Sequence, residues 1–307
     1  MKKPRPAVDL DAVLSRLDGL LARAEDLMPT PASTEPDWHG SIAWRWRKRN
    51  KSGWLQPVMH PHGIRLCDLL GIERQKERVD RNTRQFVSGY PANNVLLTGA
   101  RGTGKSSLVK ALLNEYAGRK LRLIEIEKDH LGDLPDIVDL VHERGERYIL
   151  YCDDLSFGAD EPGYQALKAV LDGSVVAASD NLLVYATSNR RHLMPEYMRE
   201  NLEAQRVDDE IHPGETVEEK ISLSERFGLW VSFYPFSQDE YLDIVRYWVK
   251  RYGAPAKDAE TLEREAIRWA LGRGSRSGRV ALQFARDWAG RQRAKRRRAE
   301  PETARGA

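Results

Sequence analysis

Residues 99–106 combine three glycines with a lysine and a serine in the pattern G-x-x-x-x-G-K-[ST]. Glycine allows backbone conformations that other residues resist, so successive N–H groups can point at phosphate oxygens. We expect Lys105 to reach the β- and γ-phosphates of a nucleoside triphosphate, and the Ser106 hydroxyl to ligate Mg²⁺. The expected phosphate-binding residues are Gly99, Ala100, Arg101, Gly102, Thr103, Gly104, Lys105, Ser106 and Ser107.

Two elements must hold this loop in place. The apolar run at residues 95–97 predicts a buried strand before the loop, and apolar residues at helical spacing over 108–113 predict a helix after it. A helix that begins near Lys105 would add the positive end of its dipole to the anion site. The loop therefore has the strand and the helix that a phosphate site of this kind requires.

A pair of carboxylates, Asp153 and Asp154, follows the apolar run at residues 149–152. In parallel sheets, ligands bind beyond the carboxyl ends of the strands. We expect Asp153 to hold Mg²⁺ through water, because this ion prefers oxygen ligands and keeps much of its hydration. Asp154 is then placed to orient and polarise the attacking water.

Asn189 follows a second apolar run, at residues 182–187. Its amide could bond the γ-phosphate or the attacking water from the neighbouring strand. The alternative is a turn at the end of the strand, since asparagine is a good turn residue.

Three arginines are candidates for neutralising charge on a transferring phosphoryl group. Arg226, before the last expected strand, is a candidate arginine finger because its planar fork suits that role. Arg279, at the start of a later helix, could reach the γ-phosphate from the opposite side, and Arg276 competes with it for this role. Simple solvation at the surface is the alternative for each of these arginines.

Strand and helix patterns alternate from about residue 65 to 235, which indicates a parallel sheet with helices on both faces. The expected strands are 95–98, 121–126, 148–153, 182–187 and 229–233. A capping box formed by Ser237 and Glu240 begins a trailing helical region. The expected divisions are an N-terminal segment at 1–60, an α/β core at 61–236, a helical lid at 237–290 and a basic tail at 291–307.

The composition is that of a globular chain. Of its 307 residues, 41% are apolar, enough for a core, and the net charge of +3 is too small to imply a partner. Cys67 and Cys152 provide no disulfide framework, and Cys152 is expected to be a buried thiol. Aspartates at 9 and 11 interrupt any signal peptide, and no apolar run is long enough to span a bilayer. We therefore expect a cytoplasmic protein without a membrane partner.

Each of four polar or amphipathic segments has more than one possible structural or functional interpretation. Leucines at helical spacing over 10–27 predict an amphipathic helix, for self-association or for packing on its own domain. Trp44 and Trp46 alternate with Arg45 and Arg47, a pattern that suits single-stranded nucleic acid but equally a strand with one buried face, which we favour. For the basic run at 291–298 we favour a charged helix end over a contact with nucleic acid or acidic protein. For the acidic run at 208–219 we favour a solvated loop.

The order of these motifs resembles that of AAA+ ATPases over roughly residues 60–290. The runs Leu70-Gly-Ile-Glu, Cys152-Asp-Asp-Leu-Ser-Phe and Ala186-Thr-Ser-Asn-Arg-Arg-His-Leu more narrowly resemble a bacterial family of AAA+-like ATPases that carries a domain of unknown function, number eight-fifteen. The resemblance implies a P-loop NTPase fold of three αβα layers with a C-terminal helical lid. It also implies assembly into a homo-oligomeric ring in which the finger reaches the neighbour's nucleotide.

The resemblance further implies roles for single residues. These are Walker A at 99–106, Walker B at Asp153 and Asp154, sensor 1 at Asn189, the finger at Arg226, sensor 2 at Arg279, and an adenine border at Leu70, Gly71 and Ile72.

One residue departs from the usual AAA+ pattern, because most of these enzymes have glutamate where this chain has Asp154. The aspartate is shorter by one C–C bond, about 1.5 Å, and a misplacement of about 1 Å can reduce a rate on the order of 10²-fold. We expect weak hydrolysis of Mg-ATP that a partner stimulates, coupled to remodelling or loading of a protein or nucleic-acid complex. The alternatives are an ATP-binding switch with little turnover and a P-loop kinase, which would need an acceptor pocket.

Overall fold

The computed structural model forms two compact units, Met1–Asp37 and Trp38–Ala307. The helix expected over 10–27 lies outside the described residues. All elements below belong to the second unit. The structure describes residues 36–49, 52–155, 162–172, 180–189, 205–207, 210–212, 225–254 and 258–299.

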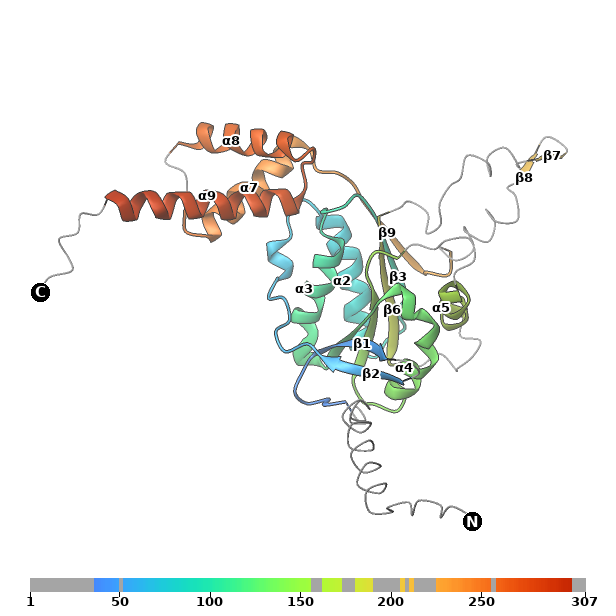
Figure 1. Ribbon diagram of the computed structural model, residues 1–307. Coiled ribbons are helices and arrows are strands. Elements are labelled where there is room, and N and C mark those ends of the chain that lie inside the picture. The colour runs from blue at the N-terminus through green and yellow to red at the C-terminus, as the bar shows by residue number, and fades with distance from the viewer. Residues whose placement is uncertain are drawn as a thin grey trace, which may run out of the picture. The chain divides into compact units, whose positions relative to one another are not determined.

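Among the described residues, seven strands form one sheet in the order β2-β1-β4-β5-β6-β3-β9 (Figure 1). The β1–β2 pair is antiparallel, and all other neighbours in the sheet are parallel. The five expected core strands are confirmed to within one residue at every end. The bounds are β1 Ala43–Arg49, β2 Ser52–Pro57, β3 Val95–Gly99, β4 Leu121–Ile126, β5 Arg147–Cys152, β6 Leu182–Ser188 and β9 Leu229–Phe233.

Helices cover both faces of this sheet. Helices α2 (Glu73–Val87) and α3 (Lys105–Tyr116) lie on one face, and α4 (Leu134–Val141) and α5 (Pro162–Asp172) lie on the other (Figure 1). Alternate strand residues serve the two sides: Leu97 packs with the α2 and α3 side chains, whereas Leu96 packs in the cluster that contains those of α4 and α5. The predicted fold, a three-layer α/β P-loop core of AAA+ type with C-terminal helices, is confirmed.

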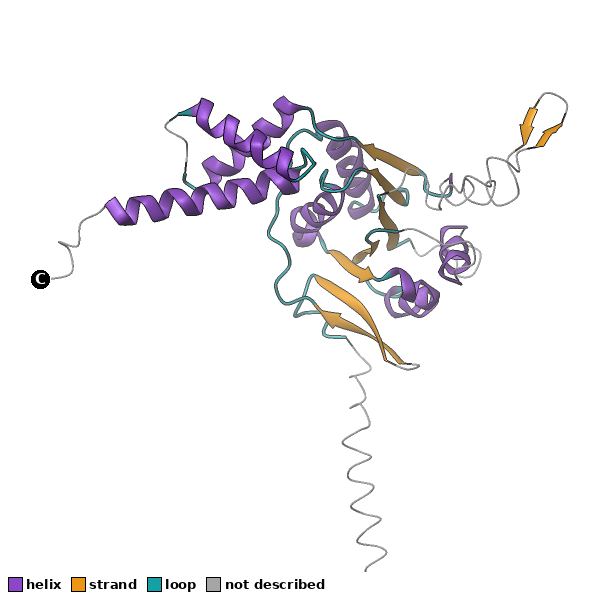
Figure 2. Ribbon diagram, turned by 45° about the horizontal axis from the view of Figure 1, so that its top comes forward, coloured by secondary structure: helices purple, strands orange, loops and turns teal. Residues whose placement is uncertain are grey.

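The β1–β2 hairpin extends the sheet beyond the strands expected from the alternating pattern (Figure 2). Trp44 and Trp46 are fully or almost fully buried, which confirms the strand with one buried face. On the other face, Arg45 pairs with Glu125 at 2.9 Å and Arg47 pairs with Glu127 at 2.9 Å. The two indoles are therefore covered by protein and not available for stacking on bases.

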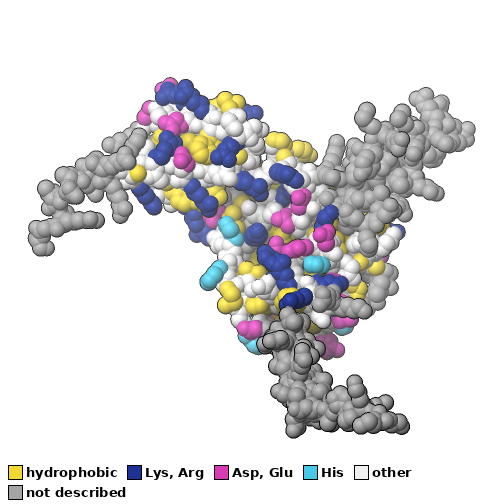
Figure 3. Space-filling view, viewed as in Figure 1, with side chains coloured by type: hydrophobic (Ala, Val, Ile, Leu, Met, Phe, Trp, Pro, Cys, Tyr) yellow, Lys and Arg dark blue, Asp and Glu magenta, His cyan; other side chains and the backbone are white. Residues whose placement is uncertain are grey.

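Three helices follow the sheet: α7 (Gln238–Arg251), α8 (Ala259–Gly272) and α9 (Gly278–Ala299). We call α7, α8 and α9 the lid. The predicted capping box is confirmed, since the Ser237 hydroxyl accepts from the Glu240 N–H and the Glu240 carboxylate accepts from the Ser237 N–H. Helix α9 continues to Ala299, so the whole basic run at 291–298 belongs to the end of this helix, as we favoured. On the face shown in Figure 3, basic and acidic side chains of the described residues are interspersed.

The structure also bears on three other expectations, which concern Cys152, the acidic run and membrane-spanning helices. Cys152 is buried without a disulfide, and burial raises the pKa of its thiol to about 12. The described part of the acidic run at 208–219 is a short strand, β8 (Glu210–His212), where we expected a loop; it pairs antiparallel with β7 (Gln205–Val207), which precedes the run. Within the part of the chain that the structure describes, no helix is both long and apolar enough to cross a membrane.

Candidate functional site

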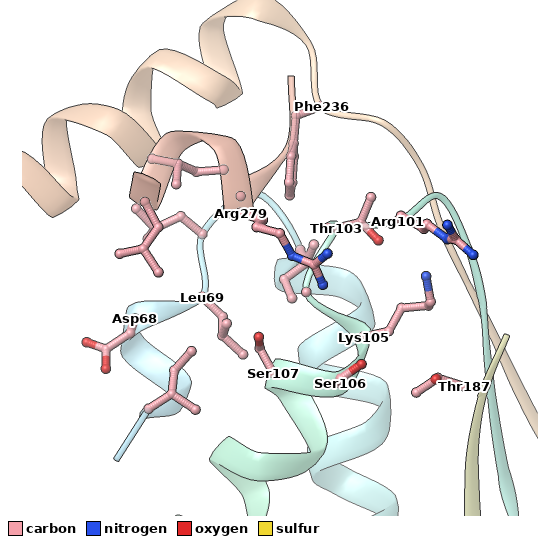
Figure 4. A pocket seen from close by; sticks show the side chains of 18 of the residues that line it. Asp68, Leu69, Arg101, Thr103, Lys105, Ser106, Ser107, Thr187, Phe236 and Arg279 are labelled. Atoms are coloured by element: carbon pink, nitrogen blue, oxygen red, sulfur yellow. The ribbon is translucent and has the colours of Figure 1, made fainter. Parts of the chain in front are cut away.

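A cavity of about 510 Å³ opens at the carboxyl end of the sheet, between the 99–106 loop and the lid (Figure 4). The loop contributes its second half and the first turn of α3, and the ends of β5 and β6 contribute polar side chains. The predicted site residues that line the cavity are Leu70, Ile72, Arg101, Gly102, Thr103, Gly104, Lys105, Ser106, Ser107, Asp153, Asp154, Asn189 and Arg279. Those outside its lining are Gly71, Gly99, Ala100 and Arg226.

Two glycines of the loop are required by close approach as well as by backbone conformation. Gly99 has φ 126°, and a Cβ there would lie 1.9 Å from the carbonyl oxygen of Phe233 in the neighbouring strand. Gly102 has φ 76°, and a Cβ there would lie 2.8 Å from the hydroxyl of Ser277, just before α9. Glycine thus lets the loop contact both the sheet and the lid.

Lys105, the first residue of α3, is 5% exposed. Its ammonium donates to the carbonyl oxygens of Gly99 at 2.7 Å and Ala100 at 2.8 Å, and to Oδ1 of Asn189 at 3.1 Å. Burial lowers the pKa of Lys105, while the charges of Asp153 and Asp154 oppose that shift. A cation and the N-terminus of a twelve-residue helix therefore face the same space.

Asp153 is joined to the first turn of α3. Its Oδ1 accepts from the Ser106 hydroxyl at 2.8 Å and from the Thr187 hydroxyl at 2.5 Å. Burial alone would raise the pKa of Asp153, but the hydrogen bonds from Thr187 and Ser106 hold it below its ordinary value. An ionised carboxylate beside a serine hydroxyl is an oxygen donor set that fits Mg²⁺.

Asp154 lies at the mouth of the cavity, with its side chain 58% exposed. Its φ of 56° is in the left-handed region, and its N–H donates to the Thr187 hydroxyl at 2.9 Å. Its carboxylate accepts from the Asn189 amide and lies 3.8 Å from the Arg101 guanidinium. One asparagine amide thus connects Lys105 with Asp154.

The three candidate arginines lie in different places. Arg279, in the first turn of α9, points its guanidinium into the cavity near Lys105 (Figure 4). Arg276 instead lines a separate hollow beside Ala100 and Phe236. Arg226 precedes β9, where its Nε lies 2.6 Å from Oδ1 of Asp172 at the end of α5.

The end of the cavity away from the Asp153 and Asp154 carboxylates is mainly apolar, and we call it the base end. Leu69, Leu70 and Ile72 line it from the core. Side chains of the lid complete it, namely Ile244 and Trp248 of α7 and Leu282 of α9. Gly71 is not part of the lining, and a Cβ there would lie 3.0 Å from the ring of Phe236.

Sequence reasoning missed Thr187 and the lid residues of the base end. Thr187 is 1% exposed and bonds both neighbouring aspartates. A polar residue at the end of the otherwise apolar run at 182–187 was a signal for it. Trp248 and Ile244 belong to the apolar stripe of α7, and nothing in that stripe distinguishes residues that line a cavity from residues of the lid interior.

Several solved structures are similar in fold at low sequence identity. A mutant of RuvB from Thermotoga maritima matches with a TM-score of 0.49 and 15% identity, over 73% of this chain and 64% of the RuvB chain. A chain of the HORMA:CdnC:Trip13 complex from E. coli MS115-1 matches with a TM-score of 0.46 and 14% identity, over 72% and 90% of the two chains. A DNA replication initiation factor matches with a TM-score of 0.45 and 16% identity, over 76% and 68%. The chain thus spans less than two thirds of the length of the RuvB chain.

No curated protein matches the chain in sequence. The model of the family described as "Protein of unknown function (DUF815)" matches residues 39–292. The matched region includes the whole sheet, the cavity and the lid up to the last turns of α9. As its motifs predict, the chain belongs to the DUF815 family.

Proposed function

We propose that the protein binds Mg-ATP in this cavity and hydrolyses its β–γ phosphoanhydride. We propose further that ATP binding and hydrolysis drive the remodelling or loading of a macromolecular partner. The observation that carries the proposal is the hydrogen bond between Ser106 and Asp153. It places a hydroxyl and an ionised carboxylate side by side at the open end of a phosphate loop. A triphosphate tail with a divalent cation is the ligand that this combination of amides, ammonium and oxygen donors suits.

Each polar residue of the cavity has a place in this proposal. The loop N–H groups and Lys105 bind the β- and γ-phosphates, and Ser106 and Asp153 hold Mg²⁺, which neutralises charge on the phosphate oxygens when bound. Asp154 and Asn189 orient the attacking water. Arg279 contacts the γ-phosphate from the lid side, where its guanidinium already points into the cavity.

Arg226 would act on a neighbouring subunit. It lies outside the lining of its own cavity, directly before the edge strand β9, and it forms an ion pair with Asp172. We therefore propose a homo-oligomer, in the form of a ring, in which Arg226 reaches the nucleotide of the adjacent copy. The client would be a protein or a nucleic-acid complex.

A second candidate function is a nucleotide switch with little turnover. The geometry of Asp154 favours it, because its short carboxylate is engaged by Asn189 and lies close to Arg101. Both candidates require ATP binding, and they differ in the rate of phosphate release.

The test measures ATP binding by calorimetry and steady-state phosphate release in the presence of magnesium. Lys105→Ala is expected to abolish both signals. Lys250→Ala, which removes an exposed lysine of α7, is the matched control and should leave both unchanged. Binding without phosphate release, with and without partners, would favour the switch. If the wild type and Lys105→Ala give equal signals in both measurements, the proposed function is wrong.

A further inference from the structure

Asp68 is a buried carboxylate at the base end of the cavity, with its side chain 1% exposed. It ends the short helix Leu66–Asp68, directly before the loop that carries Leu69. On the core side it accepts from the N–H of Arg65 at 2.9 Å and from its guanidinium at 3.3 Å. On the lid side it accepts from the hydroxyl of Tyr247 at 2.5 Å and lies 3.4 Å from the guanidinium of Arg251. One carboxylate therefore joins the core to helix α7.

The contact between Asp68 and its hydrogen-bond donors involves an ionised carboxylate. Burial alone would raise the pKa of Asp68, but the hydrogen bonds from Tyr247 and Arg65, with the charge of Arg251, hold it below its ordinary value. Hydrogen bonds to an ionised group are roughly twice as strong as neutral ones. In Figure 4 the carboxylate of Asp68 points away from Lys105 and the centre of the cavity, so its effect on a ligand would be indirect.

Both walls of the base end are attached to this carboxylate. On the lid side, Trp248 lines the cavity, and its ring packs edge-on against Tyr247 at 5.3 Å. On the core side, Lys76 donates to the carbonyl oxygens of Leu66 at 3.3 Å and Leu69 at 3.0 Å, which fixes the short helix that ends in Asp68. A change at Asp68 would therefore loosen the two walls relative to each other.

The phosphate end of the cavity has its own attachment to the lid. The N–H of Gly278, the first residue of α9, donates to the carbonyl oxygen of Gly102 at 2.9 Å. Ser277 packs directly on Gly102. Arg279 follows one residue later, so its position depends on this second attachment. The base end and the phosphate end can thus be perturbed separately.

We propose that Asp68, acting through Tyr247 and Arg251, is a positioning residue that preforms the base end of the cavity and so determines how strongly the base of a nucleotide contributes to binding. The inference rests on the proposed function, and it adds residues that none of the sequence motifs contains. A preformed site binds more tightly because its walls lose less freedom when the ligand enters. The effect should be confined to ligands that carry a base, since a bare polyphosphate contacts the other end.

The experiment compares dissociation constants of Mg-ATP and of magnesium with inorganic triphosphate, on the full chain. The variant is Tyr247→Phe, which removes one donor to Asp68 and keeps the ring. The matched control is Tyr252→Phe, because the Tyr252 hydroxyl accepts from Arg286 at 3.0 Å inside the lid. We expect Tyr247→Phe to raise the dissociation constant of ATP about 10-fold and to leave that of triphosphate within about twofold, given the usual strength of hydrogen bonds to charged groups. The control should change neither constant.

Two results would overturn the inference: Tyr247→Phe weakens both ligands equally, or it weakens neither while the wild type binds ATP. A wild type that binds neither ligand refutes the proposed function instead. The attachment is then judged without ligand, by amide hydrogen exchange over residues 65–72. Faster exchange in Tyr247→Phe than in Tyr252→Phe supports it, and equal exchange overturns it. Asp68→Asn is a stronger variant for the same measurements, and Tyr247→Phe keeps the test valid if that variant does not fold.

Discussion

The amide of Asn189 donates a hydrogen bond to the carboxylate of Asp154, across the ends of the neighbouring strands β6 and β5. Because the Arg101 guanidinium also lies 3.8 Å away, the Asp154 carboxylate has one amide donor and one cation close to it in this conformation. An attacking water polarised by Asp154 would have to share the carboxylate with Asn189. The length of the side chain at position 154 should therefore influence the rate of hydrolysis directly.

Asp154→Glu is expected to raise steady-state phosphate release, by up to about 10²-fold if the short side chain limits the rate. Asp154→Asn should reduce release while ATP affinity stays similar. Because position 154 has φ 56°, glutamate there should also lower stability, by roughly 1 kcal/mol, which thermal unfolding would reveal. Unchanged release in Asp154→Glu, with intact ATP binding, would show that reach is not the limiting factor.

Gly99→Ala is expected to destabilise the protein by more than about 2 kcal/mol, because the added Cβ would collide with the Phe233 carbonyl and φ is 126°. The matched control is Gly272→Ala at the end of α8, where a Cβ meets nothing within 4 Å. That control should be neutral or stabilising by up to about 1 kcal/mol. Urea unfolding of both variants measures the difference, and equal effects would contradict the close approach of β3 and β9.

Asp133 should contribute to a loss of stability in acid. Its carboxylate accepts from the Trp46 indole at 3.1 Å and from Lys48, so it fixes β1 to the segment before α4. Burial would raise its pKa, but these hydrogen bonds hold the pKa below the ordinary value. A folded pKa below the unfolded one gives stability that is complete above the unfolded pKa, about 4, and is lost as the pH falls through the folded pKa.

Asp133→Asn should therefore lower the free energy of unfolding at pH 7 and reduce the drop between pH 7 and pH 3. Asp139→Asn, an exposed carboxylate of α4, is the control and should keep the wild-type drop. Urea titrations at the two pH values measure both quantities. An identical drop in wild type and Asp133→Asn would contradict the role of this contact.

Arg226 acting between subunits predicts recovery of activity in a mixture. Arg226→Ala should lower phosphate release on the order of 10³-fold, as loss of an arginine finger does, without loss of ATP binding. Lys105→Ala lacks a working phosphate loop but still carries Arg226. When the two inactive variants are mixed, some intact loops gain Arg226 from a neighbour, and release should recover partly. No recovery, in mixtures that light scattering shows to be associated, would contradict action in trans.

The core strands could be predicted because buried parallel strands are short, nearly continuous apolar runs, as at 95–98 and 229–233. The pairing of β1 with β4 could not be predicted in the same way, because it joins segments about eighty residues apart and the ladder register leaves no local pattern. The alternation of Trp44 and Arg45 predicted a strand with one buried face, but which strand it pairs with depends on the whole fold.

The candidate site was predictable where chemistry and local spacing coincide, as at Lys105, Ser106 and Asp153. It was not predictable where residues meet only in three dimensions. The Lys105–Asn189 contact joins positions 84 residues apart, and Asp68 meets Tyr247 across 179 residues. The sequence allowed either Arg276 or Arg279 to face the phosphates. In the structure α9 begins at Gly278, and Arg279 lines the cavity whereas Arg276 does not.

The three oxygen atoms around the Lys105 ammonium have a thermodynamic consequence. A triphosphate that enters the cavity must exchange with acceptors that the loop already supplies from Gly99, Ala100 and Asn189. The enthalpy that Lys105 contributes to binding is then the enthalpy of its contacts with phosphate minus that of the contacts it gives up. The heat measured in a titration would therefore understate the contribution of Lys105 to the phosphate site. Its deletion removes a donor from the carbonyls of Gly99 and Ala100, although Ala100 keeps the Thr103 hydroxyl, and the empty protein should consequently melt at a lower temperature than the wild type.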